Sequence, residues 1–526
     1  MKSQGNGGSF HKTLIKSTFS ISFFTLISRV FGYIRDMLQA YFLGTGFYGD
    51  AYTIAYRIPN LLRRIVGEGA MTASFIPVFA EAKKKEGKES WVFANTFFWN
   101  LLLIVALIVI IGIIFSPLIV KIMAYGFKQI PGKWGETIYL NRLMFPYILF
   151  ISLSALAMGI LNSYNIFSVP ASTPVLFNLA IIGSVLLFLD KFKSPATAFA
   201  IGVVLGGIFQ LLFQLPFLIK IGMRFRPKIS FGDSYVRRTG KLMVPGIFGA
   251  SAVQINIFIN SQIASLLPQG AVSSLYYADR VMELTLGAFS IALATALLPL
   301  LSRQASENDI NSMKNSLRFS IKLTSFITLP AAIGLIALSN EIISVLFQRG
   351  IFNVNSTEMT SFALIFHSLG LPFISGVKIL APGFYSLKDT ATPVKISFIS
   401  IGANIVLALV LMDPLKQGGI ALAVSIASLI NFLLLWVYLE KKIGKIEKNN
   451  LISVSMKSFL SSIIMGVFLL SVKRRVFSPD EPILNKVFEL IILIISGIII
   501  YSIFSYIFNR NELKSAMKFF RKKDKL

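Results

Sequence analysis

The chain has 526 residues, of which 55% are hydrophobic and only 14% are charged. Soluble globular proteins carry about 25% charged residues, so this composition indicates a protein that crosses a membrane many times. Lys and Arg outnumber Asp and Glu by 51 to 24, but they gather in short loops between apolar runs, which is typical of membrane topology rather than nucleic-acid binding. The lack of cysteine excludes disulfides, thiolate metal sites and a cysteine nucleophile, and two isolated histidines, His11 and His367, offer little for a metal site.

The polar start of the chain, up to Lys12, leads into an apolar run with no small-residue cleavage site, so we expect that run to stay in the mature protein. Apolar runs of about 20 residues are long enough to cross a bilayer as helices, and about fourteen are present. They predict an all-α polytopic membrane protein. The approximate limits are 14–43, 51–81, 92–123, 138–164, 170–190, 195–221, 238–267, 271–302, 313–346, 357–386, 390–411, 417–440, 453–473 and 485–508.

Charged residues interrupt the first two of these spans. An ionised side chain at the bilayer centre costs at least about 2.5–3.5 kcal/mol, so such residues should face protein or water. Arg29 and Asp36 fall on nearly the same face of a helix, with Gly32 between them, which predicts an Arg/Asp pair that lines a cavity. In the second span Arg64 and Glu68 have the i,i+4 spacing of a helical ion pair. The charged residues of this stretch are Arg29, Arg35, Asp36, Asp50, Arg57, Arg63, Arg64 and Glu68.

An internal repeat is indicated by Thr173-Pro174-Val175 and Thr392-Pro393-Val394, which open the fifth and eleventh spans and are each followed by Ile-Gly at the same distance. The period predicts two six-span bundles, with spans 13 and 14 appended. Because each bundle has an even number of spans, the two bundles should share one orientation in the membrane.

A second charged cluster, Asp279, Arg280 and Glu283, opens the eighth span, where helical spacing allows the two acids to orient Arg280. Two interpretations stay open for these charges: salt bridges and helix caps within the bundle, or a binding site. Arginines outnumber convenient partners, and guanidinium matches phosphate bidentately, which favours an anionic ligand. The candidate ligand-binding residues are Arg29, Arg35, Arg63 and Arg280, with Asp36, Asp50, Arg64, Glu68, Asp279 and Glu283 as supporting or gating residues.

The loops predict the orientation. One set of loops and both tails are rich in Lys and Arg, whereas the alternate set is poorer, so we expect both termini in the cytoplasm. The basic tail 510–525 is expected to be solvated or to contact lipid headgroups. The basic loops are 83–85, 220–241, 303–322 and 441–448.

Catalytic motifs are missing from the sequence. There is no GxxxxGK[ST], HExxH or GxSxG pattern, and no acidic cluster has metal-ligand spacing. We therefore expect a transporter rather than an enzyme, without a cofactor, and driven by a sodium or proton gradient, the membrane potential or the substrate gradient.

Five strings of the sequence resemble the MurJ (MviN) lipid II flippases of the multidrug/oligosaccharidyl-lipid/polysaccharide exporter superfamily, and the likeness covers nearly the whole chain. The strings are SRVFGYIRD at Ser28–Asp36, GDAYTIAYRIPNLLRRIVGEGAMTASFIPVFAE at Gly49–Glu81, FPYILFISLSAL at Phe145–Leu156, LYYADRVMEL at Leu275–Leu284 and LAPGFYSLKDTATPVK at Leu380–Lys395.

The resemblance implies two six-helix lobes in a V around a cationic cavity, and two C-terminal helices that form a groove for a polyprenyl tail. It divides the chain into an N-terminal lobe (1–225), a C-terminal lobe (226–448) and a last part with spans 13 and 14 and the basic tail (449–526). The family's cavity arginines fall on Arg29, Arg35, Arg63 and Arg280, and its important acid falls on Asp50. Some members have a sodium site between helices seven and eleven. In this chain the seventh span has Asn256 and Asn260 but no carboxylate, and Asp389, which opens the eleventh span, is the cation-site candidate.

The implied function is translocation of lipid II, the undecaprenyl-pyrophosphate-linked peptidoglycan precursor, from the inner to the outer leaflet of the bacterial cytoplasmic membrane by alternating access. Membrane lipids and peptidoglycan-synthesis proteins are further expected partners. Three alternatives are weighed against it: an exporter of another polyprenyl-linked oligosaccharide or of drugs, a non-transporting scaffold for envelope assembly, and an integral-membrane enzyme that acts on lipid-linked sugars. A drug exporter should line its cavity with carboxylates, and a scaffold should tolerate neutral Arg29, Arg63 and Arg280.

Overall fold

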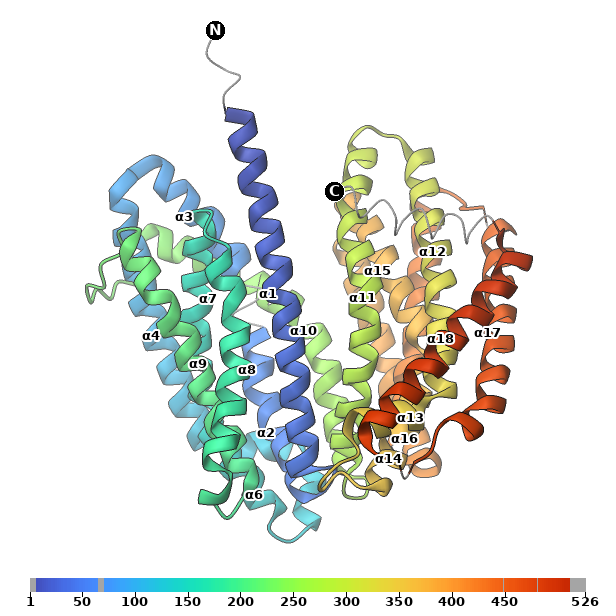
Figure 1. Cartoon of the computed structure of the whole chain (residues 1–526). Coiled ribbons are helices and arrows are strands. Elements are labelled where there is room, and N and C mark those ends of the chain that lie inside the picture. Colours follow the sequence, from blue (N-terminus) through green and yellow to red (C-terminus); the bar gives the residue numbers. More distant parts are fainter. Residues whose placement is uncertain (1–5, 65–70, 448, 480, 511–526) are drawn as a thin grey trace. The chain divides into compact units, whose positions relative to one another are not determined.

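The computed structural model describes residues 6–64, 71–447, 449–479 and 481–510 (Figure 1). Within these ranges the regular elements are helices and no strand is found, which confirms the all-α prediction. Eight of the helices described are long and apolar enough to cross a membrane, or ten if each of two bent pairs is one span. The chain divides into two compact units, Met1–Leu266 and Leu267–Leu526.

The first unit holds the helices of the first seven predicted spans. Several spans are built from two helices that meet at a break, as at Phe115 between α4 and α5 and at Phe145-Pro146 between α6 and α7. The short 3-10 helices are η2 (Gly87–Glu89), η3 (Tyr125–Gln129) and η4 (Leu189–Lys191). The α-helices are α1 (Asn6–Leu43), α2 (Phe47–Arg63), α3 (Thr72–Glu86), α4 (Ser90–Ile114), α5 (Ser116–Met123), α6 (Lys133–Met144), α7 (Tyr147–Ser163), α8 (Ser168–Phe188), α9 (Pro195–Lys220) and α10 (Ser234–Ser265).

The second unit holds the helices of the remaining spans. Two of its spans are bent pairs: Ala271–Leu286 with Ser290–Ser306, at 48°, and Val354–Leu369 with Leu371–Ser386, at 44°. The helices are α11 (Ala271–Ser306), α12 (Ile310–Ala337), α13 (Ser339–Phe347), α14 (Val354–Leu369), α15 (Leu371–Ser386), α16 (Ala391–Ile443), α17 (Asn449–Val476) and α18 (Ile483–Phe508).

Helix α16 covers the two spans predicted at 390–411 and 417–440. The helix breaks where the sequence predicts the turn, because Lys416 has a left-handed φ of 49°. Beside it, a Cβ on Gly419 would lie 2.0 Å from the carbonyl oxygen of Leu411, so only glycine fits that approach. The two predicted spans are therefore present as one interrupted helix.

Polar contacts tie α10 to the first unit. Arg238 of α10 pairs with Glu81 of α3 at 2.7 Å, and the Tyr235 hydroxyl donates to Glu86 at 2.7 Å. At its other end, Ser265 Oγ accepts from the Gly126 amide at 3.2 Å. The structural units therefore divide after α10. The division at residue 225 rests on the sequence repeat and the family resemblance, and it stays a prediction.

Candidate functional site

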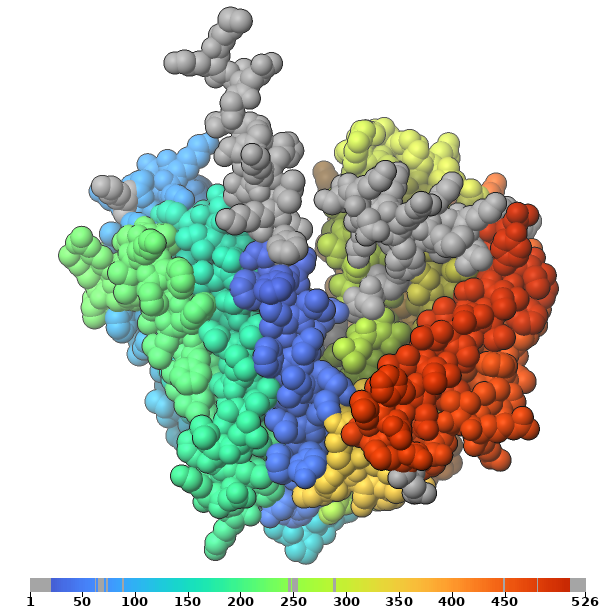
Figure 2. All heavy atoms as spheres, viewed as in Figure 1, coloured from blue at the N-terminus to red at the C-terminus, as the bar shows by residue number. Residues whose placement is uncertain are grey.

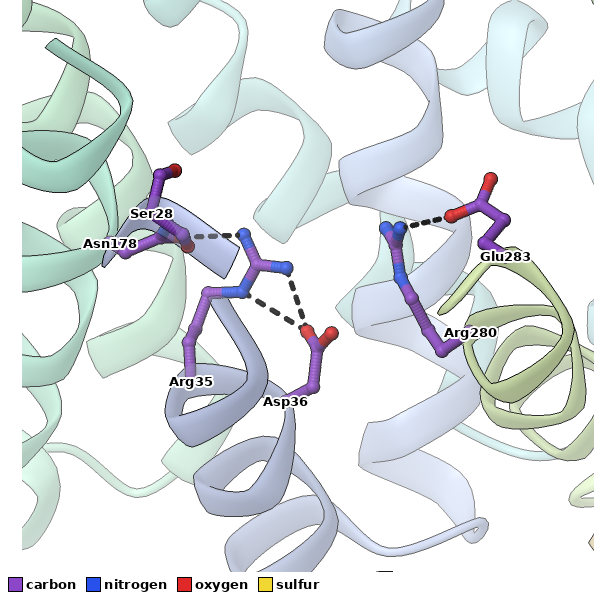
Figure 3. A network of polar contacts seen from close by, with 6 residues as sticks. All are labelled: Ser28, Arg35, Asp36, Asn178, Arg280 and Glu283. Carbon is purple, nitrogen blue, oxygen red and sulfur yellow. Dashed lines mark hydrogen bonds and ion pairs between the residues drawn. The ribbon is translucent and has the colours of Figure 1, made fainter. Parts of the chain in front are cut away.

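Arg35 lies at the contact between α1 and α8 and is buried (Figure 3). Its Nε and Nη2 donate to Asp36 Oδ1 at 3.1 and 2.7 Å, and its Nη1 donates to Asn178 Oδ1 of α8 at 3.1 Å. The amide nitrogen of Asn178 in turn donates to the carbonyl oxygen of Ser28 at 3.1 Å. Asn178 therefore fixes both the guanidinium and the α1 backbone, which holds Arg35 in one orientation.

The predicted pair of Arg29 with Asp36 is wrong, because Arg35 is the ion-pair partner that the structure gives Asp36. Consecutive residues of a helix point about 100° apart, but the Arg35 side chain is long enough for its guanidinium to contact the carboxylate of the next residue, Asp36. Arg29 is exposed and has no ion pair within the part of the chain that the structure describes. Its charge is therefore open to a ligand or to a residue outside the described ranges.

Asp50 and Lys133 form a fully buried (sealed) ion pair that the sequence did not suggest. Asp50 lies in the first turn of α2 and Lys133 opens α6, and Nζ lies 2.7 Å from Oδ2. The two side chains are only 2% and 1% exposed, respectively. Lys133 Nζ also lies 4.3 Å from the ring centroid of Phe127, a cation–π contact. Asp50 therefore joins α2 to α6 rather than facing an open site.

The other arginines of the second span have partners of different kinds. Arg57 is half-buried and its Nη1 donates to Ser261 Oγ of α10 at 2.6 Å, a role that the sequence missed. Arg63 Nε donates to Asn60 Oδ1 at 2.9 Å within α2. Arg64 is half-buried, while Glu68 lies outside the described residues, so the Arg64–Glu68 pair stays a prediction.

Arg280 is held in the second unit by two neighbours on its own helix. Its Nη1 lies 2.7 Å from Glu283 Oε2, which confirms the predicted i,i+3 contact (Figure 3). Its guanidinium carbon also lies 4.8 Å from the ring centroid of Tyr276. The Arg280 side chain is 26% exposed and that of Glu283 is 53% exposed, so an incoming anion can replace Glu283 as the partner of Arg280.

Asp279 takes a partner that the sequence did not indicate. His367 of α14 is buried, and its Nε2 lies 3.1 Å from Asp279 Oδ1. Lys378 of α15, also absent from the sequence-based set, interacts electrostatically with Glu283. Each pair joins residues more than 80 positions apart in the sequence, which local spacing cannot reveal.

Asp389 caps the start of α16. Its Oδ1 accepts from the Thr392 amide at 3.0 Å, and its Oδ2 lies 2.8 Å from Lys442 Nζ. These contacts lower the pKa of the Asp389 carboxyl, with the Lys442 ammonium as the largest cause and the Thr392 hydrogen bonds next. The Lys442 ammonium thus balances the charge of the Asp389 carboxylate. No group of three or more metal-ligating side chains is found among the described residues.

Comparison with known proteins decides the family. The family model described as "Lipid II flippase MurJ" matches residues 39–480. The chain belongs to the MurJ family. The MurJ-family relative described as "Probable lipid II flippase MurJ" from Buchnera aphidicola subsp. Schizaphis graminum is 37% identical over 516 residues, which are 97% of this chain and 100% of that one. The "Lipid II flippase MurJ" of Burkholderia cenocepacia is 37% identical over 441 residues, 82% of this chain and 84% of the relative.

A solved structure agrees with the MurJ assignment. The structure described as "Lipid II flippase MurJ, inward closed conformation" matches with a TM-score of 0.79 at 31% identity and covers 93% of this chain and 99% of that one. An inward-facing multidrug resistance transporter of the MATE family matches with a TM-score of 0.67 at 14% identity, over 80% of this chain and 96% of that one. The latter likeness shows a shared fold only.

Proposed function

We propose that this MurJ-family chain translocates lipid II from the inner to the outer leaflet of the bacterial cytoplasmic membrane by alternating access, and that it is a transporter rather than an enzyme. The observation that carries the proposal is the family match across residues 39–480. The basic loops support an orientation with both termini in the cytoplasm.

The ligand-binding residues of this proposal are Arg29, Arg35, Arg63 and Arg280, which would bind the pyrophosphate of the substrate. Guanidinium binds phosphate oxygens through two parallel hydrogen bonds, and holding it in one orientation lowers the entropy that binding costs. Arg280 is the strongest candidate, because its partner Glu283 is about half exposed and such a pair contributes little to stability. A phosphate can therefore replace Glu283 without leaving a buried carboxylate behind.

The test is to replace Arg280 with Ala in cells whose only copy of the protein is the variant. Arg303→Ala is the matched control, because Arg303 lies on the same helix and pairs with Glu307 at 2.9 Å over a similar spacing. We expect Arg280→Ala to leave lipid II in the inner leaflet, as measured by its accessibility to an external probe, while Arg303→Ala transports normally. Normal transport by an Arg280→Ala protein of normal abundance would refute the role of this arginine.

Alternating access gives a second test of the same proposal. In this proposal, positive charge from the two predicted lobes should oppose closure when no substrate is bound, and an anionic headgroup should remove that repulsion. Labels near Asp50 and near Gly270 should therefore change their separation when lipid II is added. An unchanged distance distribution, in a preparation shown to bind lipid II, would rule this mechanism out. The energy source is expected to be a sodium or proton gradient or the membrane potential, and selective ionophores would distinguish these.

A further inference from the structure

The segment that links α9 to α10 lies along α4, and we call residues 223–231 the linker strand, although they do not form a β-strand and the Arg226 amide donates to the Arg224 carbonyl oxygen at 2.9 Å. Asn95 of α4 donates its side-chain amide to the carbonyl oxygen of Arg224 and accepts from the Arg226 amide at 3.3 Å. Asn100 does the same for Ser230, donating to its carbonyl oxygen at 2.8 Å and accepting from its amide at 3.1 Å. Two side-chain amides thus pair with the backbone as a neighbouring strand would.

Apolar contacts hold the same segment to α4. Met223 is buried, and the ring of Phe225 lies edge-on to Phe98 with 5.2 Å between centroids. Since Asn100 is the eleventh residue of α4 and a helix rises 1.5 Å per residue, the linker strand follows about the first 15 Å of that helix. It is therefore fixed in place rather than hanging free at the helix end.

The position of the linker strand explains why its backbone needs these partners. Helix α4 is one of the candidate membrane spans, and its apolar side chains, among them Leu103 and Leu107, are exposed. Water satisfies the backbone of an ordinary loop, but an unpaired peptide group close to hydrocarbon costs several kcal/mol. The two asparagines satisfy backbone groups that would be costly to leave unpaired near hydrocarbon, as a segment at the boundary between headgroups and acyl chains requires.

The exposed side chains of the linker strand suit this boundary. Arg224, Arg226 and Lys228 lie close together in this short segment, and all three are exposed. Ile229 and Phe231 are also exposed, at 56% and 52%. Figure 2 shows this green stretch on the surface of the first unit. Basic side chains beside exposed apolar ones are typical of segments that bind an anionic membrane surface.

Three acids near these basic residues have other partners. Glu81 pairs with Arg238 and Lys85, and Glu86 accepts from the Tyr235 hydroxyl. Asp233 caps α10 by accepting from the amides of Tyr235 and Val236. The three acids are therefore engaged by groups outside residues 223–231.

We propose that the linker strand is a binding site for the headgroups of anionic phospholipids. Arg224, Arg226 and Lys228 contact the lipid phosphates, while Ile229 and Phe231 lie among the first carbons of the acyl chains. Asn95 and Asn100 act as positioning residues that set the depth of the segment. This site is separate from the candidate lipid II residues and does not depend on the proposed function.

Because the chain has no cysteine, a Phe231→Cys variant can carry a single fluorophore on the linker strand. The full-length protein is reconstituted in phosphatidylethanolamine vesicles that contain spin-labelled phosphatidylglycerol or spin-labelled phosphatidylcholine at equal amounts. We expect stronger quenching by the anionic lipid. The triple variant Arg224→Gln/Arg226→Gln/Lys228→Gln should lose this preference. One basic residue near a membrane contributes about 1 kcal/mol, so the association constant for the anionic lipid should fall about fivefold for each charge removed.

Two controls separate this site from general charge effects. Lys191→Gln/Lys193→Gln removes two basic residues that follow α8 and should leave the preference unchanged. A label at position 107, on the exposed apolar face of α4, should show equal quenching by the two lipids.

Equal quenching at position 231, or a preference that survives the triple substitution, would overturn the proposal. If soluble polyglutamate protects the label from quenching and phosphatidylglycerol is not preferred, the basic residues bind an acidic polypeptide instead. This result would also overturn the proposal. Asn95→Ala/Asn100→Ala should expose the peptide bond after Lys228 to trypsin, and an unchanged cleavage rate would refute the role of the two asparagines.

Discussion

Removal of one partner of the Asp50–Lys133 pair should destabilise the first unit strongly. The two side chains are 2% and 1% exposed and 2.7 Å apart, so neither charge can turn to water when the other is lost. Breaking a buried ion pair by truncating one partner costs about 3–5 kcal/mol, because the remaining charge stays buried without compensation. We therefore expect Asp50→Asn and Lys133→Met each to lower the free energy of unfolding by about that amount.

The double variant Asp50→Asn/Lys133→Met is the decisive comparison. It removes both charges and keeps similar side-chain volumes, so it should recover most of the stability that either single variant loses. The measurement is reversible unfolding in SDS of all four proteins, together with lipid II transport by the double variant. If the two single effects simply add in the double variant, the pair is not coupled and the reasoning fails. If stability returns while transport does not, Asp50 has a role beyond its pairing with Lys133.

Three further predictions concern single contacts. Arg280→Lys should retain less than a tenth of wild-type transport in the leaflet assay. A charge-assisted hydrogen bond contributes about 1.5–3 kcal/mol, and an ammonium cannot form the two parallel hydrogen bonds of a guanidinium. Full transport by this variant would contradict the prediction. Asn178→Ala should lower the free energy of unfolding in SDS by about 1–3 kcal/mol, because Arg35 loses a buried acceptor, and an unchanged value would refute that contribution. The stabilisation from Asp389 should be complete above about pH 4, where the carboxyl is ionised even in the unfolded chain, and should be lost as pH falls through the lowered folded pKa. Asp389→Asn should therefore make the free energy of unfolding less dependent on pH in acid, and it should cost about 1 kcal/mol near neutral pH because the cap is weaker. An unchanged pH dependence in acid would show that the Asp389 carboxylate does not contribute to it.

The helices were predictable because their apolar runs are long and nearly unbroken. The spans expected at 170–190 and 195–221 appear as α8 (Ser168–Phe188) and α9 (Pro195–Lys220), within a few residues. Breaks were harder to predict, since a proline in an apolar run can either start a new helix or be tolerated inside one. Pro146 precedes α7, whereas Pro174 lies inside α8.

The partners of the charged residues were only partly predictable. Spacing within a helix predicted the Arg280–Glu283 contact, because i,i+3 neighbours share a face. The same reasoning failed for Asp36, whose partner is the adjacent Arg35, since side-chain length overcame the angular separation. Lys133 and His367 were missed because their partners lie more than 80 residues away in the chain, and a single sequence carries no signal for such contacts.

The exposure of each pair suggests how this chain divides its charges between stability and binding. A sealed pair such as Asp50–Lys133 can only be broken at a cost of several kcal/mol, so it is unsuited to taking up and releasing a ligand in every cycle. Arg280 and Glu283 lie at the other extreme, because water already reaches both groups and an incoming phosphate displaces a weak interaction. Arg35 is intermediate, since it is buried but shares its hydrogen bonds between a carboxylate and a neutral amide. The arginines that bind substrate should therefore be those whose protein partners are weak or exposed, and the sealed acids should act by keeping the helices in place.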